Sequence, residues 1–273
     1  MSQKVVFITG ASSGMGRATV KYLLERDFLV YASSRDSGKL LDIEDENFTP
    51  LCMDLGSQAS IDAALERIIQ QENKIDVLVN NAGYGLVSSV EDFTEEEMQE
   101  QFNVNLFGLL RVSKAVIPHM REQKSGVIIN ISSFLGKIGL PLLTLYNASK
   151  YAVEGVTDSL RYELKDYNIR VHSILPGFFD TQFARDNLKT NAKTFSETSP
   201  YKELVENLAP QIIEQINGGN DANEVAVLIH KIIESENFPA RVTAGQKAEK
   251  FLAMRKELSD EDFERRVREY YRL

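Results

Sequence analysis

The sequence predicts an α/β fold: a single domain, residues 1–273, with a doubly wound parallel sheet and helices on both faces. Short, mostly apolar, strand-like runs alternate with helix-like segments from the first residues on. This alternation is typical of a parallel sheet covered on both faces. A chain of 273 residues can bury a large core. A composition of 43% hydrophobic and 26% charged residues is ordinary for a globular protein.

The expected strands are short runs dominated by apolar and β-branched residues. In chain order they cover residues 4–9, 28–33, 48–54, 75–80, 126–132 and 169–175, and residues 241–245 could add a last one. Such sheets bind ligands at the carboxyl ends of their strands, where the strand order reverses. Segments that directly follow a strand are therefore the candidates for a site.

Helices are expected between these strands. They run from the first turn to about residue 26, around residues 61–69, and over residues 95–123, 144–167 and 222–235. Thr94 can cap the helix that begins at Glu95, because its hydroxyl can accept from a first-turn N–H. The acidic residues that follow suit the positive end of the helix dipole.

The alternation weakens after Pro176. Residues 180–219 are polar and loosely helical, and we expect them to cover the substrate. Residues 246–273 form a helical tail with an apolar stripe that includes Phe251, Met254 and Phe263. The stripe is expected to pack on the body of the protein, and the alternative is a cover over the pocket or a dimer contact.

Charge and cysteine content exclude several classes of function. A net charge of −9 argues against a nucleic-acid partner. Neither a basic leader nor a long apolar stretch is present, so we expect a cytoplasmic protein without membrane insertion.

Cys52, the single cysteine, is expected to be a buried structural thiol rather than a reactive one. The histidines at 119, 172 and 230 are widely spaced, so no metal site is expected.

A glycine-rich turn follows the first strand and opens a helix. Its glycines, Gly10, Gly14 and Gly16, let the backbone approach a pyrophosphate without an intervening side chain. The helix that follows offers free N–H groups to an anion. The spacing differs from the common Gly-x-Gly-x-x-Gly pattern, so the loop alone could also be a structural turn.

Tyr146 and Lys150 are four residues apart, which places them on one face of a helix. A free tyrosine has a pKa of about 10, poorly matched to neutral pH. A nearby ammonium stabilises the phenolate, so Lys150 is expected to lower the pKa of Tyr146 and make it an acid/base catalyst.

Four motifs resemble those of the classical short-chain dehydrogenase/reductase family. Residues 9–16 look like its glycine motif, residues 80–83 like its second motif, residues 146–150 like its active-site motif, and residues 176–177 like a further one. The motifs occur in order and with familiar spacing. The resemblance implies a Rossmann-like fold and a nicotinamide-dependent oxidoreductase.

The resemblance also implies roles for two further residues. Ser133, thirteen residues before Tyr146, would hydrogen-bond the substrate oxygen; strand alternation points its neighbour Ser132 the other way. Asn105 would hold a water that connects Lys150 to solvent, with Asn103 as the alternative. The implied catalytic residues are thus Asn105, Ser133, Tyr146 and Lys150.

The dinucleotide would lie along the ends of the strands. The implied cofactor-binding residues are Gly10, Ser12, Ser13, Gly14, Met15, Gly16, Ser34, Arg35, Asp54, Leu55, Asn81, Ala82, Gly83, Tyr146, Lys150, Pro176, Gly177 and Thr181. Asp54 resembles the aspartate that contacts adenine, and Thr181 the residue that orients the carboxamide. Lys150 would contact the nicotinamide ribose.

The end of the second strand favours NADP(H), although NAD(H) is possible. Ser34 occupies the place where an acid would bind the ribose 2′-hydroxyl, and Arg35 follows it. An arginine can bind a 2′-phosphate through two parallel hydrogen bonds. The alternative is that Arg35 is a solvated loop charge, and Asp36 opposes the assignment. Arg17 is a weaker phosphate candidate.

The expected reaction is hydride transfer between nicotinamide and a carbonyl or its alcohol. The apolar residues Phe134, Leu140, Leu142, Leu143, Phe178, Phe179 and Phe183 suggest an apolar ligand, as in hydroxysteroid and retinol dehydrogenases. The alternative is that they pack the core around a small polar carbonyl. The resemblance also implies a homodimer or homotetramer that pairs through residues 95–123 and 144–167.

Two other functions are compatible with parts of the pattern. A non-catalytic dinucleotide-binding redox sensor would keep the glycine loop but lack the proton relay. An epimerase or dehydratase of an extended relative shares Tyr-x-x-x-Lys, but it usually has a different glycine spacing and a larger substrate domain.

Overall fold

The computed structural model describes residues 3–181 and 187–273. Its main sheet has seven parallel strands in the order β3-β2-β1-β4-β6-β7-β11. These strands are β1 (Val5–Thr9), β2 (Leu29–Ser34), β3 (Phe48–Cys52), β4 (Val77–Asn80), β6 (Gly126–Ile131), β7 (Ile169–Pro176) and β11 (Arg241–Ala244). The order reverses between β1 and β4, so the predicted parallel sheet and its switch point are confirmed.

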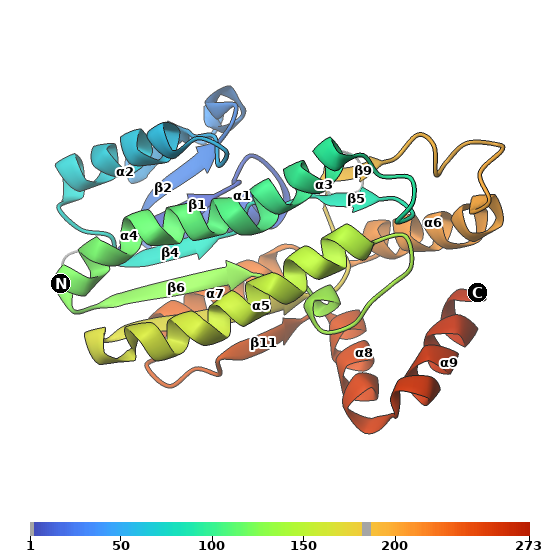
Figure 1. Ribbon diagram of the computed structural model, residues 1–273. Helices are drawn as coiled ribbons and strands as arrows, with labels where there is room; N and C mark the ends of the chain where they lie inside the picture. The colour runs from blue at the N-terminus through green and yellow to red at the C-terminus, as the bar shows by residue number, and fades with distance from the viewer. Residues whose placement is uncertain (1–2, 182–186) are drawn as a thin grey trace.

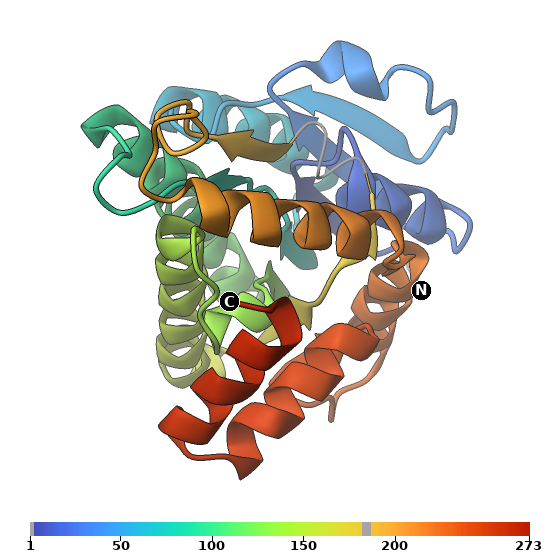
Figure 2. The ribbon, with the colours of Figure 1, turned by 90° about the vertical axis from the view of Figure 1, so that its right-hand side faces the viewer.

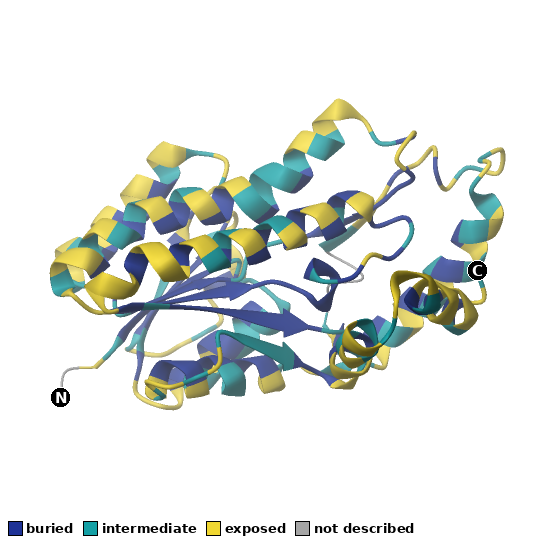
Figure 3. Ribbon diagram, turned by 60° about the horizontal axis from the view of Figure 1, so that its bottom comes forward, coloured by how far each residue is buried: buried dark blue, intermediate teal, exposed yellow. Residues whose placement is uncertain are grey.

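Helices cover both faces of the sheet, as predicted (Figure 1). They are α1 (Gly14–Leu24), α2 (Gln58–Glu72), α3 (Glu95–Phe102), α4 (Leu109–Gln123), α5 (Thr144–Leu164), α6 (Lys202–Asn217), α7 (Asn223–Glu234), α8 (Gln246–Glu257) and α9 (Asp260–Tyr271). In Figure 1, α2, α4 and α5 lie in front of the sheet, and α1 and α7 lie behind it. Figure 3 shows buried strands between helices whose outer sides are exposed.

Alternating residues of each strand divide between two cores. In β1, Val6 and Ile8 pack with α1 and α7, whereas Val5 and Phe7 pack with α2, α4 and α5. All four side chains are fully buried. Strand alternation explains the division, because successive side chains point to opposite faces. At about 25 cal/mol per Å² of apolar surface, these two cores are the main source of stability.

The predicted helix over 95–123 is interrupted. Thr94 and Glu97 form a reciprocal capping box at the start of α3, which confirms the predicted cap. A π-helical turn, η2 (Asn103–Gly108), then separates α3 from α4. Such π turns widen the hydrogen-bond spacing locally and are frequent at functional sites.

The described residues after β7 include short strands that were not predicted. It contains a short strand, β9 (Leu188–Thr190), which pairs in parallel with β5 (Gly85–Val87). A second small pair joins β8 (Phe179–Asp180) to β10 (Asn220–Asp221). Figure 2 looks onto the carboxyl-end edge of the sheet, where α6 (orange) runs across and α8 and α9 (red) lie below it.

The C-terminal stripe packs on the body of the protein, as favoured above. Phe251, Phe263, Val267 and Tyr271 are buried in a third core. Tyr271 is fully buried, whereas its neighbour Tyr270 is only partly buried. Among the described residues, no helix has both the length and the apolarity needed to cross a membrane.

Candidate active site

The β1–α1 turn is shaped by two glycines in the left-handed region. Gly10 has φ +66° and Gly14 has φ +54°. A Cβ on Gly10 would lie 2.6 Å from the Cα of Ala82. The turn therefore needs glycine both for its conformation and for its approach to the β4 turn. It ends at the N-terminus of α1, where backbone N–H groups can bind an anion.

Asn81 ties this turn to the neighbouring strand. Its side-chain amide donates to the carbonyls of Thr9 (3.0 Å) and Gly10 (2.8 Å). The backbone N–H groups of Asn81 and Ala82 both donate to the Thr9 hydroxyl at 3.1 Å. The amide of Asn81 thus holds the glycine turn in place.

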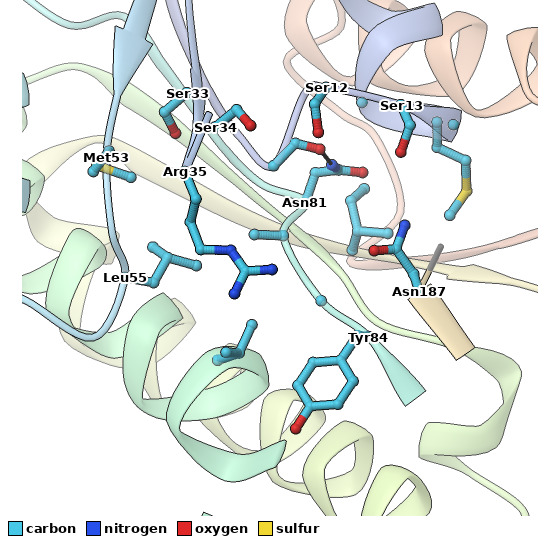
Figure 4. Close-up of a pocket in the computed structure, with 18 of the residues that line it drawn as sticks. Ser12, Ser13, Ser33, Ser34, Arg35, Met53, Leu55, Asn81, Tyr84 and Asn187 are labelled. Atoms are coloured by element: carbon cyan, nitrogen blue, oxygen red, sulfur yellow. Dashed lines mark hydrogen bonds between the residues drawn. The ribbon is translucent and has the colours of Figure 1, made fainter. Parts of the chain in front are cut away.

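A cavity of about 400 Å³ runs from this turn along the carboxyl ends of the strands. The predicted cofactor residues that line it are Gly10, Ser12, Ser13, Gly14, Met15, Gly16, Ser34, Arg35, Asp54, Leu55, Asn81, Ala82, Gly83, Tyr146, Lys150 and Thr181. Pro176 and Gly177 instead line an adjoining apolar branch. Figure 4 shows Ser12 and Ser13 on one side of this cavity and Arg35 and Leu55 on another.

The chemistry of this cavity suits a dinucleotide. The glycine turn offers backbone N–H groups, and the Ser13 hydroxyl makes no cap hydrogen bond in α1. Arg35 is an exposed cation at the far end, beside the ends of β2 and β3. An anion-binding helix terminus and a separate cation fit a molecule with a pyrophosphate and a further phosphate.

Asp36 and Arg17, which left the assignment of the 2′-phosphate to Arg35 open, bind other groups of the protein. The Asp36 carboxylate accepts from the Gly38 N–H at 3.0 Å and caps the short helix η1 (Ser37–Leu40). Arg17 pairs with Asp42 and donates to the Lys39 carbonyl at 2.9 Å.

The expectation for Cys52 was wrong: its side chain is exposed rather than buried. Cys52 ends β3, an edge strand of the sheet, and lies beside the carbonyl of Arg35 (Sγ–O distance 3.4 Å). Its neighbours Leu51 and Met53 are buried, so strand alternation turns Cys52 away from the core.

Tyr146, Ser133 and Lys150 come together where the cavity meets its apolar branch. Tyr146 lines both spaces, Ser133 lines the branch, and Lys150 lines the cavity. The Lys150 ammonium lies 5.8 Å from the centre of the Tyr146 ring and donates to the Ile131 carbonyl at 2.8 Å. The helix α5 supplies Tyr146 and Lys150, and the end of β6 supplies Ser133.

Burial is the main cause of the pKa shifts of Tyr146 and Lys150. Burial raises the pKa of Tyr146 to about 12, and a hydrogen bond with Ser133 lowers it only in part. The expectation of a lowered Tyr146 pKa is therefore wrong for this structure, because desolvation of the phenolate dominates. Burial also lowers the pKa of Lys150 to about 8, while Glu154 opposes that change.

Asn105 is buried behind the site, in the π-helical turn. Its amide donates to the Tyr84 carbonyl (2.9 Å) and the Ser149 hydroxyl (3.1 Å), and its oxygen accepts from the Tyr84 N–H (3.0 Å). The alternative candidate, Asn103, accepts from Arg111 at 2.7 Å. Asn103 lines the cavity, whereas Asn105 braces the β4–β5 turn against α5.

The apolar branch contains part of the predicted hydrophobic set. Phe134, Leu143, Phe178 and Phe179 line it, together with residues of α6. Leu140 and Leu142 are buried in the third core instead. Phe183 lies outside the described residues.

Sequence reasoning missed one wall of the cavity. Tyr84, Glu100, Asn187 and Lys189 all line it. Lys189, on β9, pairs with Glu100 at 2.9 Å and lies over the Tyr84 ring at 4.7 Å. Tyr84 directly follows the second motif, which could have suggested it. No local pattern marks Lys189, because the β5–β9 pairing brings it there.

The seven-stranded parallel sheet and the cavity at the carboxyl ends of its strands are those of a dinucleotide-binding oxidoreductase. The family model of the short chain dehydrogenases matches residues 4–192. The chain belongs to this family, whose enzymes act on CH–OH groups with NAD(P).

Individual relatives agree with this assignment. A 3-ketodihydrosphingosine reductase of Bacteroides thetaiotaomicron is 36% identical over 245 residues, which cover 90% of this chain and 89% of that protein. A short-chain dehydrogenase structure from Streptomyces avermitilis superposes with a TM-score of 0.84 at 29% identity, over 100% of this chain and 97% of that one. A Burkholderia cenocepacia short chain dehydrogenase in complex with NADP gives 0.76 at 25% identity, over 97% and 98%.

Proposed function

We propose that this enzyme interconverts a carbonyl and an alcohol on an apolar small molecule, with NADP(H) as cofactor. One observation carries the proposal: Tyr146 lines both the cavity along the strand ends and the apolar branch beside it. A substrate in the branch would therefore meet the reactive end of a dinucleotide at this side chain. Ser133 and Lys150 flank the same position.

A bound nicotinamide supplies or accepts the hydride. The protein supplies the proton and the orientation. In reduction, Tyr146 donates its proton to the carbonyl oxygen while Ser133 holds that oxygen by a hydrogen bond. A raised pKa keeps Tyr146 protonated at neutral pH, as a proton donor requires. The positive charge of Lys150 stabilises the phenolate that remains.

The choice of NADP(H) rests on Arg35. Asp36 caps η1, and Ser34 accepts from the Asp36 N–H at 3.3 Å. The exposed guanidinium of Arg35 thus lies beside a serine, where an acid would otherwise bind the ribose hydroxyl. Structural neighbours of this chain bind NADP or NAD, so the proposed preference rests on Arg35.

The apolar branch supports a lipid-like ketone or alcohol. Its walls combine Phe134, Leu143 and Phe178 with Ile212 and Ile216 of α6. The name of the Bacteroides thetaiotaomicron relative, a ketosphingoid reductase, fits such a substrate. The branch holds about 80 Å³, which is room for the reactive end of a long molecule only. A small polar carbonyl is the competing substrate.

We also propose that two or four copies associate through the outer faces of α4 and α5. Phe107 precedes α4 in η2 and Leu110 lies in its first turn; both are exposed, as are Tyr151 and Tyr162 of α5. Aromatic residues of this kind are enriched at protein interfaces.

The test is a spectrophotometric assay of NADPH oxidation with short and long aliphatic ketones and aldehydes. We expect turnover with the apolar carbonyls and a loss of about 10²–10⁴ in kcat for Tyr146→Phe. The matched control is Tyr162→Phe, since Tyr162 is exposed on α5 and lines neither the cavity nor its apolar branch. Tight NADPH binding without turnover of any carbonyl would instead favour a redox sensor.

A further inference from the structure

Glu154 is a buried carboxylate that the proposed reaction does not use. It lies on α5 one turn beyond Lys150, which itself lies one turn beyond Tyr146. Only 2% of the residue is exposed. Residues four apart on a helix are neighbours on its surface, about 5–6 Å apart at Cβ. The carboxylate therefore continues the face that carries the two proposed catalytic groups.

Two cations hold this carboxylate. Arg241, on β11, donates from Nε to the Glu154 carboxylate at 2.6 Å, and the Lys137 ammonium lies 3.4 Å from the same oxygen. The other carboxylate oxygen is buried and has no hydrogen-bond partner in the described part of the chain. These pairs offset the cost of burying the carboxylate, and the oxygen without a hydrogen-bond partner leaves its charge able to act on other neighbours.

Gly136 brings Glu154 close to the turn that carries Ser133. A Cβ on Gly136 would lie 2.9 Å from the Lys150 carbonyl oxygen, 2.9 Å from the Ser132 hydroxyl and 3.2 Å from Cγ of Glu154. Gly136 is therefore close to the Lys150 backbone, the Ser132 hydroxyl and the side chain of Glu154. There, the carboxylate acts on its neighbours with little screening by solvent.

We propose that Glu154 is a positioning residue whose carboxylate keeps the Lys150 ammonium charged within the active site at mildly alkaline pH. The inference rests on the proposed roles of Tyr146 and Lys150. Burial of Lys150 favours its neutral amine, which could not stabilise a phenolate. A carboxylate one turn away opposes that loss.

Other polar and charged groups also surround the Lys150 ammonium. Tyr146 is neutral at these pH values. The η2 turn presents the amide of Asn105 to Lys150, and the turn after β4 presents the backbone of Gly83. Arg241 from β11 and Lys137 from the turn after β6 partly offset Glu154. Asp158 pairs with the far side of Arg241 and is half exposed, so solvent screens it.

The experiment compares Glu154→Gln with the wild type. The amide keeps the shape but loses the charge, so the Lys150 ammonium should lose its proton about one pH unit lower. The measurement is the ¹⁵N NMR titration of lysine side chains, with Lys150 assigned from its loss in Lys150→Arg. The alkaline limb of kcat, measured with the best ketone, should move by the same amount in the same direction.

Two further variants separate a charge effect from damage to the fold. Asp158→Asn removes the exposed partner of Arg241 and should leave the Lys150 titration unchanged. Arg241→Gln removes the counter-charge of Glu154 and should move the titration to higher pH. It also keeps the inference testable if Glu154→Gln does not fold, with unfolding temperatures measured for each variant.

Opposite shifts for Glu154→Gln and Arg241→Gln support the inference. An unchanged Lys150 titration in folded Glu154→Gln overturns it, as do equal shifts in all three variants. The titration needs no turnover. A Lys150 shift without any carbonyl reduction would therefore leave this inference standing and remove the proposed function alone.

Discussion

At the scale of single residues, burial shifts the pKa values of Tyr146 and Lys150 more than their contacts with neighbouring groups do. Lys150 is buried and Tyr146 is partly buried, and desolvation favours the neutral form of each. The spacing of the two residues is readable from the sequence, because a helix fixes it. The depth of the surrounding protein is not readable, and this is why the expected direction of the Tyr146 pKa shift was wrong.

The Lys150 pKa of about 8 predicts how reduction depends on pH. Below that value the ammonium is charged and stabilises the phenolate that forms when Tyr146 gives up its proton. Above it the amine is neutral, so kcat for carbonyl reduction should fall as pH rises through about 8. A stopped-flow series between pH 6 and pH 10 measures this limb. A flat profile across that range would contradict the role given to Lys150.

Arg35 predicts the cofactor preference. Arg35→Ala should reduce kcat/KM for NADPH by about 10–100-fold, because a charge-assisted contact to a phosphate is worth roughly 1.5–3 kcal/mol. The value for NADH should change little. Arg17→Ala is the matched control, since Arg17 is paired with Asp42. Equal losses of kcat/KM with both cofactors in Arg35→Ala would show that Arg35 does not bind the 2′-phosphate.

At the scale of elements, local signals predicted what local geometry determines. The glycine turn, the Thr94 cap and the seven main strands were all recognisable from short stretches of sequence. The pairing of β5 with β9 was not, because it joins segments about 100 residues apart. Lys189 reaches the cavity wall through that pairing and was missed for the same reason.

The β1–α1 turn makes a prediction about one glycine. Gly10→Ala should destabilise the protein by about 1–3 kcal/mol, since it combines a left-handed φ with an overlap on Ala82. Binding of NADPH should weaken as well, measured by its fluorescence. Gly155→Ala is the control, because Gly155 lies in α5 with no atom within 4 Å of an added Cβ. That variant should gain up to about 1 kcal/mol in denaturant unfolding.

At the scale of the whole molecule, the arrangement of layers was predictable, whereas the way in which α6, α8 and α9 meet was not. Alternating apolar strands and amphipathic helices specify two cores on the two faces of one sheet. The third core gathers side chains from the β6–α5 loop, α6, α8 and α9. These contacts connect segments without a shared local pattern, so sequence periodicity alone could not place them.

The exposed faces of α4 and α5 predict an oligomer. Leu110→Glu and Tyr162→Glu should shift the molar mass measured by light scattering toward that of one chain, because a charge would be buried in the interface. Ile213→Glu, on α6, tests the specificity of the effect, since Ile213 is 45% exposed on a different helix. The proposed interface is wrong if all three variants keep the wild-type mass.

The exposed thiol at the end of β3 makes the protein convenient to study. Cys52 is the only cysteine in the chain, and its sulfur lies beside the carbonyl of Arg35. A maleimide dye would thus attach at one known place, near the adenosine end of the proposed nucleotide site, without prior mutagenesis. Its emission could then report occupancy in real time, for inactive variants as readily as for active ones.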